Sequence, residues 1–125
     1  MFTRYTGNRQ FDLQLNRTFQ PILDRAGMDE MAATTLPQLR STREITTLAQ
    51  RLAERFSSEG DADAAWRLYE LAAFYLGAGD PRKGRFIDAM SAAFDEAHKG
   101  LALARHAVPY RGGELTAMRW EADPV

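Results

Sequence analysis

Residues 62–77, ADAAWRLYELAAFYLG, are apolar nearly all the way round a helix, and this stretch limits the fold more than any other. A helix with so little polar surface needs neighbours on several sides. Asp61 is placed to cap its first turn, and Gly77 is placed to end it. The stretch therefore predicts a central helix with other helices packed around it.

Two amphipathic segments precede this stretch in the N-terminal third of the chain. Residues 9–26 carry apolar side chains at three- and four-residue steps, which is typical of one face of a helix. Pro21 falls inside that pattern and predicts a kink or a break, because proline lacks the amide hydrogen that a helix interior needs. Gly27 ends the segment, and a short helical piece over 28–36 follows it.

Capping signals mark the start of two further helices. Ser41 and Glu44 fit a capping box, in which each side chain bonds a free amide of the first turn. An unbroken apolar stripe follows them, up to residue 56. Asp80 and Pro81 suit the N-cap and the first position of a last helix, which we expect to run to about residue 98 with an apolar face. That face is expected to point inward, and it consists of Phe86, Met90, Ala93, Phe94 and Ala97.

The end of the chain has a different pattern. Two short apolar runs in residues 107–120 flank the pair Gly112 and Gly113, which is typical of a β-hairpin with a tight turn. A lone two-stranded hairpin is marginally stable in water. The sequence thus predicts a mainly α fold of four to five helices, over 1–106, ending in a β-hairpin over 107–125.

Composition excludes several classes of protein. The 125 residues suffice for one domain, and the net charge of −1 argues against a nucleic-acid partner. The chain has no cysteine, and its first ten residues lack the apolar core of a signal peptide. No apolar run reaches the length of a membrane span. We therefore expect a cytoplasmic protein with no membrane partner.

Motifs for catalysis, metal binding and phosphate binding are missing from the sequence. No glycines frame a serine as in G-x-S-x-G, and His98 and His106 are too far apart for a helical metal pair. Both histidines are interpreted as structural, with His98 suited to the negative end of a helix. The glycines of residues 77–84 are interpreted as an inter-helix turn. The sequence predicts no catalytic residue, no metal and no cofactor. Glu70 lies on the apolar helix and either pairs with Arg67 or Arg85 or faces a cavity, and the ion pair is favoured because buried carboxylates are usually paired.

Four aromatic residues of the apolar helix are the candidate binding residues. Trp66, Tyr69, Phe74 and Tyr75 fit the core of a bundle, and they also fit the wall of an apolar ligand pocket. In such a pocket one tyrosine hydroxyl would orient a substrate. Both interpretations can hold for different residues of the same helix.

Residues 67–97 and 108–120 together resemble one group of serine α/β-hydrolases. In the helical N-terminal segment of the 2,6-dihydroxypseudooxynicotine hydrolase-like and fermentation-respiration-switch-like (FrsA-type) proteins, a helix with spaced Tyr and Ala leads through a D-P-x-K turn to a second helix. A strand related to V-P-Y-x-G-x-x-L then opens the hydrolase sheet. The residues that carry the resemblance are Arg67, Tyr69, Ala72, Tyr75, Asp80, Pro81, Lys83, Phe94, Ala97, Val108, Pro109, Tyr110, Gly112 or Gly113, and Leu115.

This resemblance covers about half of the chain and implies a function for it. The helices would be the cap region of a serine hydrolase, and the hairpin would begin its sheet. The Ser-His-Asp triad would lie outside these 125 residues, so the chain alone would not be catalytic. The implied partners are the α/β-hydrolase catalytic domain, from the same gene or a separate chain, and a small apolar or aromatic substrate of ester, amide or C–C bond hydrolysis.

Two other interpretations remain at this point. Residues 71–80 have the Leu-to-Gly-Asp spacing of a tetratricopeptide helix pair, which would make the chain a protein-interaction module. Alternatively, the chain is a small helical protein that binds an apolar ligand among its own helices. A homodimer is compatible with any of these interpretations.

Overall fold

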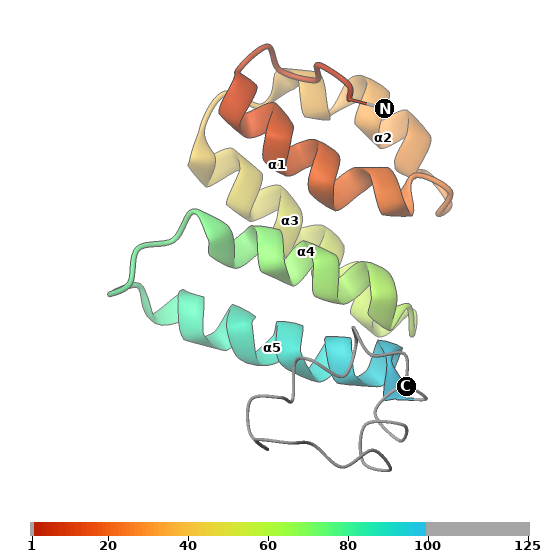
Figure 1. The fold of residues 1–125 in the computed structure, drawn as a ribbon, viewed down its shortest axis with the longest axis vertical. Helices are drawn as coiled ribbons and strands as arrows, with labels where there is room; N and C mark the ends of the chain where they lie inside the picture. Colours follow the sequence, from red (N-terminus) through yellow and green to blue (C-terminus); the bar gives the residue numbers. More distant parts are fainter. Residues whose placement is uncertain (1, 100–125) are drawn as a thin grey trace, which may run out of the picture.

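The computed structural model describes residues 2–99, and these residues form five α-helices and two short 3₁₀ turns without a β-strand. The mainly helical fold is therefore confirmed for this part of the chain, whereas the expected hairpin and the boundary at residue 106 lie outside it (Figure 1). The helices and turns in chain order are α1 (Arg9–Phe19), η1 (Gln20–Ile22), α2 (Met28–Thr34), η2 (Leu36–Gln38), α3 (Thr42–Ser58), α4 (Ala62–Phe74) and α5 (Pro81–Ala97).

The break predicted near Pro21 lies where the sequence places it. Helix α1 ends at Phe19, and the chain continues as the 3₁₀ turn η1 with Pro21 at its start. The chain then turns into α2 through Gly27, whose φ of 82° lies in the left-handed region that glycine tolerates. The apolar pattern of residues 9–26 is thus divided between a helix and a turn.

Side-chain caps begin the three longer C-terminal helices. The Ser41 hydroxyl accepts a hydrogen bond from the Glu44 amide at 3.2 Å, and the Glu44 carboxylate accepts one from the Arg40 amide at 2.6 Å. The capping box is therefore confirmed, but Glu44 reaches one residue further back than a standard box does. Asp61 and Asp80 cap α4 and α5 as predicted, through the amides of the first turn.

The end of α4 differs from the prediction. The helix stops at Phe74 with Tyr75 as its C-cap, two residues before Gly77. The left-handed glycines among the described residues are Gly7, Gly27 and Gly60, so Gly77 does not supply the expected left-handed cap. A wide turn of exposed residues leads from there to Asp80.

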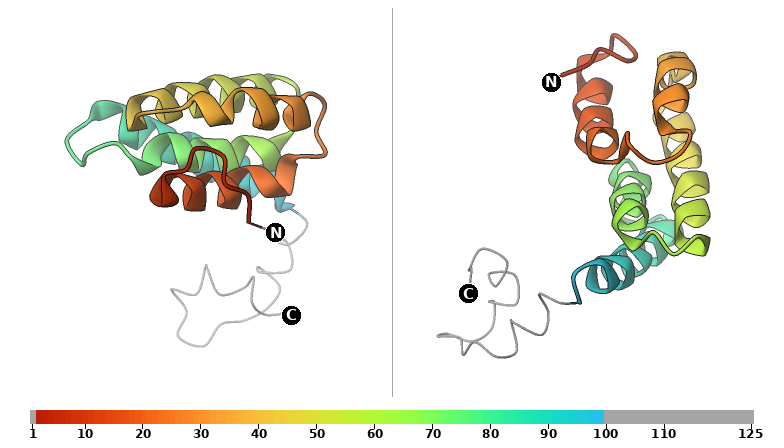
Figure 2. Two further views of the ribbon diagram at one scale, coloured as in Figure 1. Left: turned by 90° about the horizontal axis from the view of Figure 1, so that it is seen from above. Right: turned by 90° about the vertical axis from the view of Figure 1, so that its right-hand side faces the viewer.

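Helix α4 is central, as its apolar composition predicts. It packs against α3 on one side and α5 on the other, and α1 also contacts it (Figure 2). Ala64, Ala65, Leu68 and Ala72 are fully buried along it. Burial of such side chains is the main source of stability in a domain of this size. The core otherwise draws on α1, η1, α2, η2 and α3, with Leu15, Phe19, Ile22, Met28, Leu36, Ile45, Ala49, Ala53 and Phe56 as its most buried members.

Within residues 2–99, helix α5 packs closely on α4 alone, and it lies at the edge of the helical layer (Figure 1). Phe86 is its single buried residue. Of the face expected to point inward, Met90, Ala93 and Phe94 are half-buried and Ala97 is exposed. Ala93 packs against the core and Phe94 contacts Trp66 of α4, so the expectation was wrong for Ala97 alone.

Candidate binding groove

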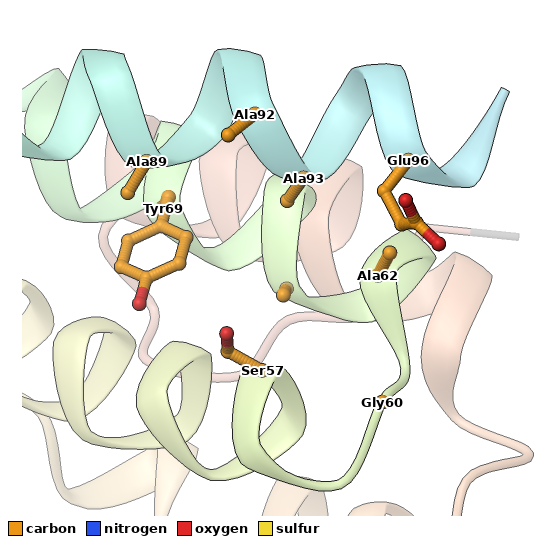
Figure 3. Close-up of a pocket in the computed structure, with 9 residues that line it drawn as sticks. Ser57, Gly60, Ala62, Tyr69, Ala89, Ala92, Ala93 and Glu96 are labelled. Carbon is orange, nitrogen blue, oxygen red and sulfur yellow. The ribbon is translucent and has the colours of Figure 1, made fainter. Parts of the chain in front are cut away.

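A groove lies where the end of α3 and the turn after it face α4 and α5 (Figure 3). Its volume of about 390 Å³ falls in the range of small-molecule sites. Small side chains form most of the walls, so the groove is open because nothing large fills it. The lining residues are Ser57, Gly60, Ala62, Ala65, Tyr69, Ala89, Ala92, Ala93 and Glu96.

Helix register explains how these small residues meet. Ala62, Ala65 and Tyr69 lie three and four residues apart, so they share one side of α4. Ala89 and Ala92 follow the same spacing on α5. Gly60, with a φ of 82°, makes the sharp turn that brings the end of α3 back onto α4. The groove thus follows from the antiparallel packing of α4 between two neighbours.

Tyr69 is the aromatic residue of this groove, and Ser57 on α3 faces it (Figure 3). Burial and the negative charge of Glu54 raise the pKa of Tyr69, and the nearby Ser57 hydroxyl partly offsets them. The phenol therefore stays protonated at neutral pH and serves as a hydrogen-bond donor rather than a base. Its ring also packs near Phe86, at 6.3 Å between centroids, which holds it between the two helices.

The described lining of the groove carries groups for binding but no pair of a nucleophile with a histidine. Its polar side chains are the hydroxyls of Tyr69 and Ser57 and the carboxylate of Glu96, which pairs with Lys99 at 2.9 Å. Among residues 2–99 no histidine lines it, so none of the described histidines can activate Ser57. No cluster of metal-binding side chains occurs within residues 2–99. The arrangement is suited to holding an apolar molecule with a hydrogen-bond acceptor.

Trp66 lies on the other side of the α4–α5 interface. Its ring meets Phe94 edge-on at 5.1 Å, and its indole nitrogen donates to Asp63 at 3.3 Å. The Arg67 guanidinium lies 4.7 Å from the Trp66 ring. The structure thus separates Trp66 from Tyr69, although both were candidates for one pocket wall.

Phe74 and Tyr75 do not line the groove either. Phe74 is 46% exposed and touches Tyr75 edge-on at 4.9 Å. Tyr75 packs against Phe11 and lines a smaller hollow of about 150 Å³ beside the start of α3. Its buried hydroxyl has no hydrogen-bond partner in the described part of the chain, and burial raises the pKa of Tyr75. Of the four aromatic candidates, none belongs to the fully buried core.

Two other sequence-based interpretations have clear outcomes. Glu70 forms an ion pair, but its partner is Arg17 of α1 at 2.8 Å rather than Arg67 or Arg85. Helix α1 packs beside α4, which brings together residues that are 53 positions apart in sequence. His98 lies at the end of α5 as expected, and its Nδ1 donates to the Phe94 carbonyl at 2.8 Å.

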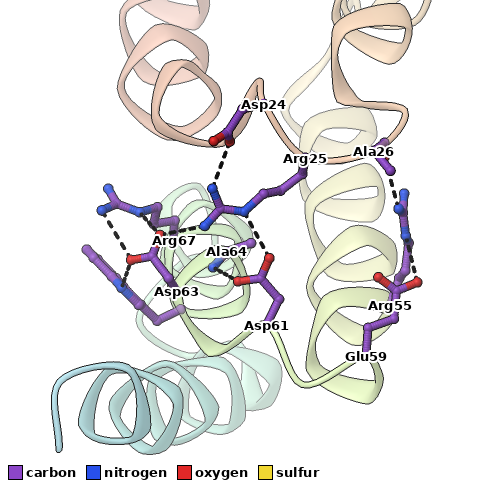
Figure 4. A network of polar contacts seen from close by, with 10 residues as sticks. Asp24, Arg25, Ala26, Arg55, Glu59, Asp61, Asp63, Ala64 and Arg67 are labelled. Carbon is purple, nitrogen blue, oxygen red and sulfur yellow. Dashed lines mark hydrogen bonds and ion pairs between the residues drawn. The ribbon is translucent and has the colours of Figure 1, made fainter.

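A second polar cluster ties the turn after α1 to the start of α4 (Figure 4). Arg25 donates to Asp61 at 2.9 Å, to Asp63 at 3.0 Å and to Asp24 at 2.7 Å. The hydrogen bonds that Arg25 donates to Asp61 and Asp24 raise the pKa of Arg25, so it remains charged. Every donor in this cluster has an acidic partner, which marks it as a structural clamp rather than a binding site.

Sequence reasoning missed most of the groove. Ser57, Gly60 and the alanines of α5 carry no signal of binding by themselves. The spacing of small residues at Ala62 and Ala65 and at Ala89 and Ala92 was the available signal. This spacing can be interpreted as a space between two helices only when their relative register is known, and the sequence alone does not give that register.

No protein-family model, no curated protein and no solved structure matches this chain.

Proposed function

We propose that these helices are the substrate-covering cap of a serine α/β-hydrolase whose Ser-His-Asp triad lies outside the chain. The observation that supports this proposal is the groove at Tyr69, whose lining within residues 2–99 has walls and a hydrogen-bond donor but no serine–histidine pair. A cap contributes such walls while another domain contributes the reaction. The half-exposed apolar side of α5 supports it as well, since a further domain would cover it.

In the proposed enzyme the catalytic domain would lie over the open side of the groove. The alanine walls would exclude water from the substrate, which strengthens polar interactions at the reacting centre. The neutral Tyr69 hydroxyl would donate a hydrogen bond to a substrate oxygen and so orient it. The substrate would be small and apolar or aromatic, because the groove holds about 390 Å³ and has mostly alanine in its walls.

The first experiment is the intact mass of the native polypeptide that carries this sequence, followed by labelling with a fluorophosphonate and assay on chromogenic esters. A longer product that is labelled at a serine and hydrolyses the ester is the expected result. A native product that ends at Val125, with no serine hydrolase bound to it, would overturn the proposal.

Tyr69→Phe and Tyr75→Phe form a matched pair for testing the groove in the hydrolytically active protein. Both remove one phenol oxygen from α4 or its cap, but only Tyr69 lines the groove. We expect Tyr69→Phe to lower kcat/KM by about tenfold, the loss of one hydrogen bond of ~1.4 kcal/mol, with the melting temperature unchanged. Tyr75→Phe should leave kcat/KM unchanged and should not lower the melting temperature, because its buried hydroxyl has no hydrogen-bond partner within residues 2–99. If Tyr69→Phe lowers the melting temperature and leaves kcat/KM unchanged, Tyr69 is a core residue and not a binding residue.

A tetratricopeptide-like interaction module is the alternative proposal. The successive packing of α3 on α4 and α4 on α5 supports it. Gly84 stands where such a repeat would pack an alanine, and this position departs from the repeat pattern. It is exposed, and a Cβ added there would have open space around it. The intact-mass experiment separates the alternatives, since an interaction module would carry no serine labelled by the fluorophosphonate.

A further inference from the structure

The smaller hollow beside Tyr75 lies where the start of α3 meets the end of α4 and the first turn of α5. Its volume is about 150 Å³, and within residues 2–99 it is lined by Thr42, Arg43, Thr46, Tyr75, Leu76 and Arg82. Five of these six side chains are polar, two of them are cationic, and none of the six is acidic. The Tyr69 groove differs, because its lining is mostly alanine and includes a carboxylate. The composition of this hollow favours an anion.

The two arginines of the hollow come from different helices. Arg43 is the second residue of α3, and Arg82 is the second residue of α5. Asp80 accepts hydrogen bonds from Nε of Arg82 at 3.1 Å and from Nη2 at 2.8 Å. Because a guanidinium has five N–H donors, Asp80 orients Arg82 and still leaves donors for a ligand. The carboxylate of Glu44 is bonded to the Arg40 amide, so the charge of Arg43 adds a net positive charge to the hollow.

Neutral donors complete the lining of the hollow. The Tyr75 hydroxyl is buried and has no hydrogen-bond partner within residues 2–99, which is an unfavourable state for a polar group. Thr46 is only 3% exposed, yet it lines the hollow as well. The amides of Thr42 and Arg43 lie in the first turn of α3, ahead of the first amide that bonds to the helix backbone, at Ile45. A ligand with several acceptor oxygens would satisfy these donors together.

We propose that this hollow binds the phosphate group of a small ligand, with Arg43 and Arg82 as its ionic partners and the Tyr75 hydroxyl as a further donor. The volume equals that of about five water molecules at about 30 Å³ each, and a phosphate group has a similar number of heavy atoms. Guanidinium groups bind phosphate oxygens through paired N–H donors. A carboxylate offers only two acceptor oxygens, so a phosphate group matches this set of donors better.

Inorganic phosphate and the phosphate of a phosphomonoester share this chemistry, and both are possible sources of the group. The inference is independent of the proposed hydrolase function, because the residues that line the hollow and those that line the Tyr69 groove are different.

Titration of the ¹⁵N-labelled full chain with inorganic phosphate, followed by the amide signals in nuclear magnetic resonance spectra, tests the inference. The ionic strength is held constant with sodium chloride, because a change in screening alone alters the environment of exposed charges. The amide signals of Thr42, Arg43, Tyr75 and Arg82 should shift together and saturate with one dissociation constant. Shifts that do not saturate, or equal shifts when sodium chloride replaces the phosphate, would overturn the inference.

Variants of the lining assign the binding to this hollow. Arg43→Gln and Arg82→Gln should each raise the dissociation constant about tenfold, because each removes a charge-assisted hydrogen bond. Tyr75→Phe should raise it about threefold, since a neutral donor contributes less. Arg51→Gln is the matched control, because Arg51 is exposed on α3 but does not line the hollow. Arg43 and Arg82 are also exposed, so their variants should keep the helical circular dichroism. Equal affinity of the Arg43 and Arg51 variants would refute the inference.

A parallel titration with phenyl phosphate distinguishes the two sources of the phosphate group. Both probes are used at a pH well above the second pKa of about 6 that phosphomonoesters have, so that they carry similar charge. Phenyl phosphate that binds as tightly as inorganic phosphate, or more tightly, assigns the hollow to a phosphorylated ligand. Tighter binding of inorganic phosphate assigns it to the free ion. If neither probe binds, the inference is wrong, whereas the proposed function at Tyr69 is unaffected.

Discussion

Replacement of Arg25 by alanine should cost this fold a substantial part of its stability. The Arg25 side chain is 25% exposed and joins the turn after α1 to two acidic residues of α4 or its cap. Its bonds to Asp61 and Asp63 are partly shielded from water, and each should contribute about 1 kcal/mol. Its pair with Asp24 should contribute little, because that carboxylate is 78% exposed. Arg25→Ala should therefore lower the free energy of unfolding by about 2 kcal/mol.

Thermal unfolding followed by circular dichroism at the helix band measures this loss. A decrease of about 2 kcal/mol in a domain of this size corresponds to about 10 °C in melting temperature. Arg51→Ala is the control, because Arg51 is exposed on α3, and it should change the melting temperature by less than about 2 °C.

A double-mutant cycle assigns the effect to the Arg25–Asp61 pair. Asp61 accepts a hydrogen bond from the Ala64 amide at 3.1 Å. Asp61→Asn removes the charge and keeps a side-chain oxygen that can accept this bond. The two substitutions should be non-additive by about 1 kcal/mol. Full additivity, or an Arg25→Ala variant as stable as Arg51→Ala, would refute the view that this cluster clamps α1 to α4.

The remaining predictions use denaturation and pH. Ser41→Ala should lower the free energy of unfolding by about 1 kcal/mol, measured by urea denaturation, because it removes the cap of α3. Leu68→Ala should lower it by about 3 kcal/mol, because Leu68 is fully buried in α4. Although burial opposes the shift, the Ala64 amide and Arg25 lower the pKa of Asp61 below its value in the unfolded chain. Its contribution to stability should therefore be complete above about pH 4 and be lost at lower pH, and Asp61→Asn should flatten that part of the stability profile.

The order of the helices and their starts could be predicted from local sequence. Ser41, Asp61 and Asp80 each cap a helix because a short polar side chain reaches the free amides two or three residues ahead. Such contacts lie within one turn, so they depend on neighbouring residues alone. Pro21 acts equally locally, by removing an amide donor from the helix.

Contacts between distant residues could not be predicted in the same way. The ion pair of Glu70 with Arg17 needs α1 to lie beside α4, and nothing near residue 70 specifies that neighbour. Likewise, the spacing of Met90 and Phe94 shows which side of α5 is apolar. It does not show how many helices cover that side, and within residues 2–99 α4 alone packs closely on it.

Two of the aromatic candidates, Trp66 and Tyr69, illustrate why one helix presents two separate surfaces. The side chains of Trp66 and Tyr69 are three positions apart and project about 60° from each other around α4. Because α5 packs along the line between them, Tyr69 opens into the alanine-lined groove while Trp66 meets Phe94 on the opposite side. A helix that is apolar nearly all round therefore has two separate surfaces once a single neighbour covers the line between them. On our proposal, the surface at Tyr69 receives the substrate, whereas the surface at Trp66 packs on Phe94, so substitutions at Tyr69 should affect activity and substitutions at Phe94 should affect the packing of α5 on α4.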